Sequence, residues 1–149
     1  MKNIAILMAI AGCMLLPSCG SNRTSGQVAA GGVWQAQLIG GESPASTFSF
    51  IVQFTINADS TLNITYFQLV TSGPCMQTAN TPSGTLAVTT NANNQVVGPL
   101  AMTVTSASPS GNTLTLNGNE VGGTITGTWS WTGSGNCNIT STGQFTMTD

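Results

Sequence analysis

The sequence predicts an all-β fold in which eight antiparallel strands form an up-and-down meander that closes into a barrel. Apolar and polar residues alternate with a period of two from residue 33 onward. Clusters of Asn, Gly, Pro and Ser separate the alternating runs. No stretch after residue 20 has the 3.6-residue period of a helix. A β-sandwich is the alternative, because a period of two is common to closed and open sheets.

Residues 1–18 are predicted to be a secretory signal peptide. Met1-Lys2-Asn3 is a short basic start, and residues 4–16 form an apolar run. This run is too short to span a hydrocarbon core of about 30 Å. We therefore expect export of the chain rather than a membrane-spanning helix.

Leu16-Pro17-Ser18-Cys19 resembles the lipobox of bacterial lipoproteins. The resemblance implies that Cys19 carries diacylglycerol and an N-acyl chain, which together hold the protein on a membrane. Ile10-Ala11-Gly12-Cys13 matches the same pattern, so Cys13 is the alternative lipidation site. Gly20 stands where an Asp would retain a lipoprotein at the inner membrane, which implies the outer membrane, at its periplasmic face or the cell surface. Residues 19–32 are small and polar and are predicted to be a flexible tether.

The barrel domain is expected to span residues 33–149. Each predicted strand is an alternating run bounded by turn-forming residues, and the turn between the sixth and seventh strands is placed at Gly118-Asn119. The eight predicted strands are residues 33–38, 47–57, 61–69, 84–90, 99–106, 113–117, 123–132 and 141–148.

The alternation assigns one apolar and one polar face to the strands. The polar face is neutral and rich in Thr, as expected for an antiparallel sheet with one solvated face. Phe67 and Leu69 are predicted to point outward, and Ile51 is an exception in its strand. Large side chains predicted to line the interior, and to contact any ligand held there, are Trp34, Phe50, Phe54, Tyr66, Met102, Trp129 and Trp131.

Cys75 and Cys137 are predicted to form a disulfide, since two cysteines remain in an exported domain once Cys13 and Cys19 are set aside. Strand parity supports this pairing, because alternate connections of an up-and-down meander lie at the same end of the barrel. Cys75 lies between the third and fourth predicted strands and Cys137 between the seventh and eighth, so both fall at the same end of a meander. The tether enters at the opposite end.

Composition excludes several classes of function. The chain has two Lys and Arg residues and no His, whereas nucleic-acid binding needs basic side chains to neutralise phosphates. No base is present to activate a Ser or Thr nucleophile. The four carboxylates are assigned to turns, connections and the C-terminus, and the cysteines lack zinc-site spacing. These carboxylates are Glu42, Asp59, Glu120 and Asp149. The sequence thus predicts a protein that is not an enzyme and binds no metal or cofactor.

Gly32-Val33-Trp34 opens the first predicted strand with a GxW motif. This motif resembles the start of the lipocalin-like (calycin) barrels. The final hairpin, residues 123–147, is similar to that of small bacterial lipoproteins with lipocalin- or avidin-like barrels. The resemblance implies a barrel whose closed end is plugged by Trp34.

The predicted function is that of a lipid-anchored, non-enzymatic module of the bacterial cell envelope that contacts an envelope protein or polymer. The long connection around Pro74-Cys75-Met76 is the first candidate for the contact. One alternative is a lipocalin-like carrier of a small apolar ligand, suggested by the aromatic inner face. Another is a periplasmic inhibitor in which a loop blocks a partner's cleft.

Overall fold

The computed structural model describes residues 32–41 and 48–149. The predicted signal peptide, the lipidation of Cys19 or Cys13, most of the tether and Glu42 lie outside the described residues. The strands are β1 (Val33–Ile39), β2 (Ser49–Ile56), β3 (Leu62–Thr71), β4 (Thr78–Ala79), β5 (Ser83–Leu86), β6 (Thr89–Thr90), β7 (Val96–Ser108), β8 (Thr113–Val121), β9 (Thr124–Thr132) and β10 (Thr140–Thr148), with a short 3-10 helix, η2 (Gly135–Cys137).

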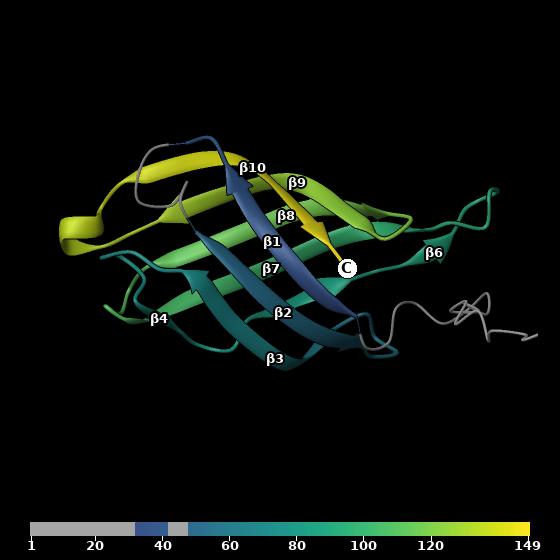
Figure 1. Ribbon diagram of the computed structural model, residues 1–149, viewed down its shortest axis with the longest axis horizontal. Coiled ribbons are helices and arrows are strands. Elements are labelled where there is room, and N and C mark those ends of the chain that lie inside the picture. The colour runs from purple at the N-terminus through teal and green to yellow at the C-terminus, as the bar shows by residue number, and fades with distance from the viewer. Residues whose placement is uncertain (1–31, 42–47) are drawn as a thin grey trace, which may run out of the picture.

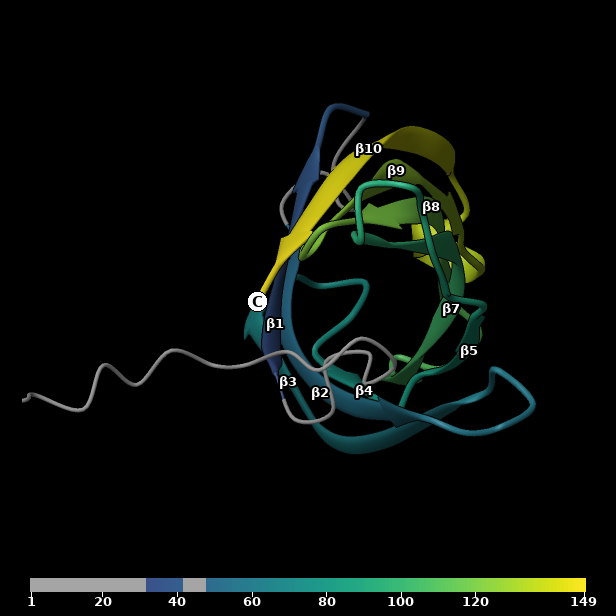
Figure 2. The ribbon, with the colours of Figure 1, turned by 90° about the vertical axis from the view of Figure 1, so that its right-hand side faces the viewer.

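These strands form an eight-stranded, antiparallel, nearly closed barrel (Figures 1 and 2), which confirms the predicted fold class. Hydrogen-bonded neighbours follow the order β3-β2-β1-β10-β9-β8-β7. The short strands β4, β5 and β6 each pair with β7 and together form the eighth strand of the barrel. The first and last strands pair directly, from Gln35 opposite Thr148 to Ile39 opposite Gln144. Within the described ranges, no helix is long and apolar enough to cross a bilayer.

The largest differences from the predicted strand boundaries concern β8 and the segment that forms β5 and β6. β8 continues through Gly118 to Val121, so the predicted turn at Gly118-Asn119 is wrong. The turn instead lies at Gly122 and Gly123, whose φ values of 60° and 95° suit a tight two-residue hairpin. The predicted strand at residues 84–90 is divided into β5 and β6. Pro99 stands opposite this break and has no N–H to donate to the ladder.

The outer face of β3 also differs from the prediction. Two β-bulges interrupt its pairing with β2, because Thr65 and Val70 have no partner in the β2 register. The first bulge reverses the alternation, so Tyr66 is 46% exposed while Phe67 and Leu69 pack against the core. The predictions that Tyr66 lines the interior and that Phe67 and Leu69 point outward are therefore wrong.

The inner faces of the strands form one buried hydrophobic cluster. Six of the seven side chains predicted to line the interior belong to it, each at most 2% exposed. These are Trp34, Phe50, Phe54, Met102, Trp129 and Trp131. Trp34 stacks on Phe54 near the start of β1, with ring centroids 5.9 Å apart. Phe48 packs on Trp131 toward the opposite end, with centroids 5.4 Å apart.

Two glycines provide space for aromatic rings in this interior. Gly143 stands opposite Trp129 across the β9–β10 ladder, and a Cβ on Gly118 of β8 would lie 2.8 Å from Cζ of Phe145. A Cβ on Gly143 would lie 2.6 Å from the Trp129 ring and 2.4 Å from the Ile39 carbonyl oxygen. Neither the ring nor the backbone can move away without disturbing the sheet, so glycine is required here.

Replacing Gly143 by alanine is therefore expected to destabilise the barrel by about 2 kcal/mol, as overpacking of a close-packed interior does. Thr142→Ala is the matched control, because Thr142 is exposed on the outer face of the same strand. Urea unfolding followed by tryptophan fluorescence measures both variants. Equal stability of the two would show that the interior tolerates the added methyl group.

Candidate functional site

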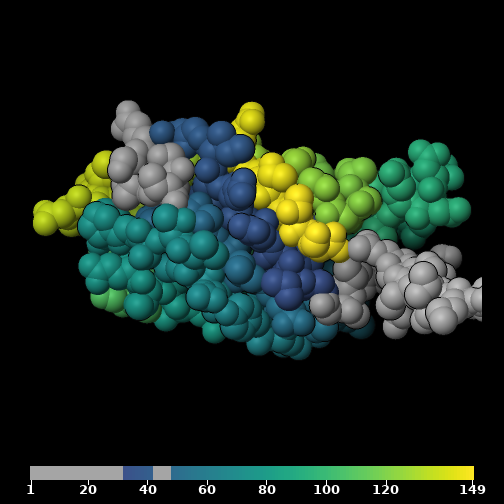
Figure 3. All heavy atoms as spheres, viewed as in Figure 1, coloured from purple at the N-terminus to yellow at the C-terminus, as the bar shows by residue number. Residues whose placement is uncertain are grey.

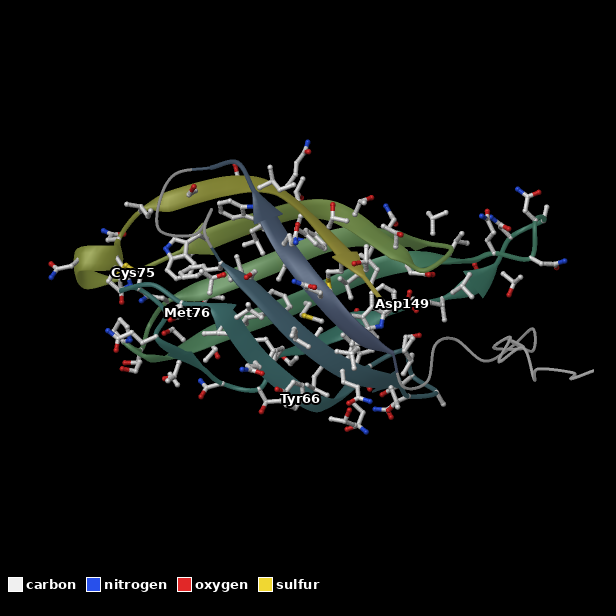
Figure 4. All side chains as sticks on the ribbon, viewed as in Figure 1. Tyr66, Cys75, Met76 and Asp149 are labelled. Carbon is white, nitrogen blue, oxygen red and sulfur yellow. A yellow bond between two sulfur atoms is a disulfide. The ribbon has the colours of Figure 1, made fainter. Side chains whose placement is uncertain are left out.

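The candidate site is the end of the barrel that carries Cys75 and Cys137, and its central feature is residues 72–77, here called the plug segment. The chain leaves β3, crosses this end of the barrel and then reaches β4 (Figure 2). Met76 is fully buried and Cys75 nearly so, and both lie at the left-hand end of the molecule in Figure 4. The predicted contact loop is therefore partly a structural element that covers the core.

Apolar contacts seat the plug segment against the core. Met76 shares the buried cluster with Phe48 and Trp131. Gly73 packs over Phe48, because a Cβ added to Gly73 would lie 3.3 Å from Cε1 of that ring. Gly73 and Met76 also exchange backbone hydrogen bonds of 3.0 and 3.2 Å, which close the segment into a tight turn. The plug segment is thus a folded turn with its apolar side chain inside the barrel.

The predicted disulfide joins the plug segment to the connection between β9 and β10. Cys75 and Cys137 are bonded, with their Cα atoms 5.7 Å apart. The parity prediction is confirmed, since both cysteines lie at one end of the meander. β1 begins at Val33 at the other end, where Asp149 also lies (Figure 4).

Asn112 is a second cross-link at this end, and it lies between the predicted strands at residues 99–106 and 113–117. Its side chain is 1% exposed. Its amide nitrogen donates to the Cys75 carbonyl oxygen over 2.7 Å, and its amide oxygen accepts from the Ser134 N–H over 2.9 Å. Its backbone oxygen accepts from the Ser106 N–H over 2.9 Å. One buried side chain thereby joins three segments that are distant in sequence.

The outward surface formed by the three connections that the cross-links join is neutral. Exposed residues around the cross-links are small or carry hydroxyl and amide groups, among them Pro74, Pro109, Ser110 and Asn136. None of the described residues in the three joined connections is charged. Association through this surface would therefore depend on shape and hydrogen bonding rather than on long-range steering.

The described carboxylates have local roles away from this end. Asp59 caps the β2–β3 turn, where the Thr61 hydroxyl donates to it over 2.6 Å and lowers the pKa of this exposed carboxyl below 3.8. Glu120 belongs to β8 rather than to a turn, and it is buried. Its Oε1 accepts the Gly123 N–H over 2.8 Å, which fixes the β8–β9 turn. Within residues 32–41 and 48–149, no group of three His, Cys, Asp or Glu residues is placed to hold a metal ion.

Two shallow grooves of about 440 and 350 Å³ cross the outer face over β5 and β7 to β10. Both are bordered by Thr126 and Thr128, and their polar groups are hydroxyls, carboxamides and backbone groups. They contain no ionisable side chain. Their chemistry is therefore limited to neutral hydrogen bonding.

The fold and the site define an eight-stranded, nearly closed antiparallel barrel with one end covered by a disulfide-linked segment. No protein-family model matches the chain, and comparisons with curated proteins and with solved structures found no match.

Proposed function

We propose that this protein is an exported bacterial lipoprotein whose barrel is a non-enzymatic interaction module of the cell envelope. Lipid on Cys19 holds the chain on a membrane, with the outer membrane as the proposed address. The disulfide-bearing end contacts an envelope protein or polymer. The lipobox-like Leu16-Pro17-Ser18-Cys19 and the resemblance to lipocalin-like lipoproteins support this proposal.

The observation that carries the proposal is the opposite placement of Val33 and the disulfide. The barrel begins at Val33, where the proposed tether joins it, while Cys75 and Cys137 lie at the far end. Thirteen residues lie between Cys19 and Val33, which is about 45 Å of fully extended chain. A barrel anchored in this way carries its cross-linked end on the side opposite its point of attachment.

The arrangement of the disulfide-bearing end favours surface contact over the alternative role as a carrier. A ligand entering here would have to displace Met76 and the plug segment, which the disulfide and Asn112 both restrain. The same cross-links hold the outer loops in a fixed arrangement. A pre-organised surface of this kind binds at a lower entropic cost than mobile loops do.

Mass spectrometry of the mature N-terminus from a membrane fraction tests the anchor. We expect a diacylglyceryl-modified Cys19, membrane retention that is lost in Cys19→Ala, and retention that persists in Cys13→Ala. A free, unmodified amino terminus after export would overturn the anchoring. Loss of retention in Cys13→Ala alone would move the lipid to Cys13.

Site-specific photo-crosslinking in intact cells tests the orientation of the contact. A photoreactive residue at Asn136, on η2, is expected to give a discrete adduct. The same residue at Asn93, in the turn between β6 and β7 at the opposite end, is the matched control and is expected to give none. Adducts at Asn93 only, or at neither position, would contradict the proposed contact surface.

A further inference from the structure

The barrel wall is incomplete along one seam, which we define as the boundary between β3 and the wall formed by β4 and β5. Over Leu62–Thr71, β3 pairs only with β2, while β4 and β5 pair only with β7. The seam is joined at one end by the bridge from Thr61 to Thr85 and by the Leu86 N–H, which donates to the Ser60 oxygen over 2.9 Å. Beyond that point, the described β3 residues have no ladder on this side.

Inward-facing side chains beside the seam are less buried than the inward-facing side chains of the neighbouring strand. On the neighbouring strand β2, Phe50, Val52 and Phe54 are at most 1% exposed. Inward-facing Ile64, Phe67 and Leu69 of β3 are only partly buried, although they pack against the same core. The open edge therefore combines unpaired backbone groups with apolar surface.

The usual protection of an exposed edge is reduced here. Natural sheets guard their edges with charged side chains, prolines or bulges. No charged residue occurs from Thr61 to Leu86, and β3 contains no proline. Its bulges at Thr65 and Val70 leave Tyr66–Leu69 as a regular stretch between them. β3 forms the lower margin of the face in Figure 3, and Tyr66 points away from the barrel in Figure 4.

We infer that the seam is a binding site for an extended strand of a partner protein, which adds to β3 as a further strand of the barrel. Main-chain hydrogen bonds supply the affinity in this mode, and alternate side chains supply the specificity. Inward residues of the added strand would cover Ile64, Phe67 and Leu69 and must be apolar. The strand must also be uncharged at its buried positions, because no opposite charge borders the seam and a buried unpaired charge is costly.

This site is separate from the disulfide-bearing end, and only the choice of a partner strand over a second copy of the chain rests on the proposed lipid anchor. A second copy of the chain is a less suitable occupant. Antiparallel pairing of two β3 strands would direct the two Val33 ends in opposite directions, away from a common membrane. The partner-strand proposal and the proposed function can thus fail independently.

Selection from a phage-displayed library of random 12-residue peptides against the exported full-length protein tests the inference. We expect the enriched peptides to carry apolar, uncharged residues at every second position. Bound peptide should slow hydrogen exchange of amides between Asn63 and Thr71, with little change in β9. N-methylation of alternate peptide amides should abolish binding, because it removes the donors without changing the side chains.

Thr65→Pro and Thr65→Ala form a matched pair of variants. Thr65 has no partner in the β2 register, and bulges tolerate proline. Both variants lose the bond from the Thr65 hydroxyl to the Gln53 oxygen, but only proline also removes the N–H. We expect Thr65→Pro to weaken peptide binding by about tenfold or more and Thr65→Ala to change it by less than about twofold.

Absence of enriched peptides, protection of other amides, or binding that survives N-methylation would each overturn the proposal. Equal binding by the two Thr65 variants would do the same. If circular dichroism shows that Thr65→Pro is unfolded, the N-methylated peptide decides the question. A dimer in light scattering that Thr65→Pro converts to a monomer would identify a second copy as the occupant and would also overturn the partner-strand proposal.

Discussion

Removal of the disulfide by Cys75→Ala with Cys137→Ala is expected to lower the free energy of unfolding by about 4 kcal/mol. The bond closes a loop across a sequence separation of 62 residues, and chain-entropy estimates for loops of this length give about that value. The loss should be cooperative with release of the plug segment, because Cys75 adjoins the fully buried Met76. For a domain of this size, the change corresponds to a fall in Tm of roughly 12 °C.

Differential scanning calorimetry measures this effect. The control is the protein without substitutions, measured in the presence of a reductant. The reduced protein and the double alanine variant should have matching Tm values. A fall in unfolding free energy of less than about 1 kcal/mol would mean that the remaining contacts hold the plug segment without the bond.

Replacement of Asn112 by alanine is expected to lower the free energy of unfolding by about 3 kcal/mol. The substitution leaves the Cys75 carbonyl oxygen and the Ser134 N–H without their side-chain partner. Each buried polar group that is left without a hydrogen-bond partner costs about 1–3 kcal/mol. Because the change creates no large cavity, lost hydrogen bonding is the main cause.

Asn112→Asp is the sharper variant, since it preserves the size of the side chain. A carboxylate still accepts the Ser134 N–H, but it presents an acceptor to the Cys75 oxygen where the amide donates over 2.7 Å. Burial raises the pKa of such a carboxyl above that in the unfolded chain. In the aspartate variant, protonation of this carboxyl contributes to the free energy of unfolding at a pH below the unfolded pKa. This contribution is lost as the pH rises through the folded pKa.

Urea unfolding of the alanine and aspartate variants at pH 3.5 and pH 7 tests both statements. Equal destabilisation of the aspartate variant at the two pH values would contradict the assigned donor. A double-mutant cycle with the cysteine variant should be non-additive, because Asn112 and the disulfide hold the same segment. Additive losses would show that the two cross-links act independently.

Much of the fold follows from the sequence because a strand has a period of two. One apolar and one hydroxyl-rich face along each run predicted the interior positions of Trp34, Trp129 and Trp131. Chain order and strand parity predicted that Cys75 and Cys137 meet. These features depend on local alternation and on a simple meander, in which each strand lies beside its sequence neighbours.

Features of the candidate site were less predictable. The importance of Asn112 depends on three connections that converge only in the folded chain, and an Asn in a Gly-rich turn gives no sign of it. Met76 stands in a long connection, where a single apolar residue is ordinary. The adjacent Tyr66 and Phe67 were a usable signal, because two successive aromatic residues cannot both belong to one face of a regular strand.

By itself, the sequence determined the all-β class, the two faces of most strands and the cysteine pairing, and the proposed lipid anchor rests on the sequence alone. The tertiary structure decided where the alternation shifts, how the chain closes one end and which side of the barrel stays open. A bulge at Thr65 is a property of the pairing with β2, since only the partner strand shows that one residue is extra. Likewise, Glu120 is buried because β8 continues past Gly118 opposite Gly127, a match that requires both strands.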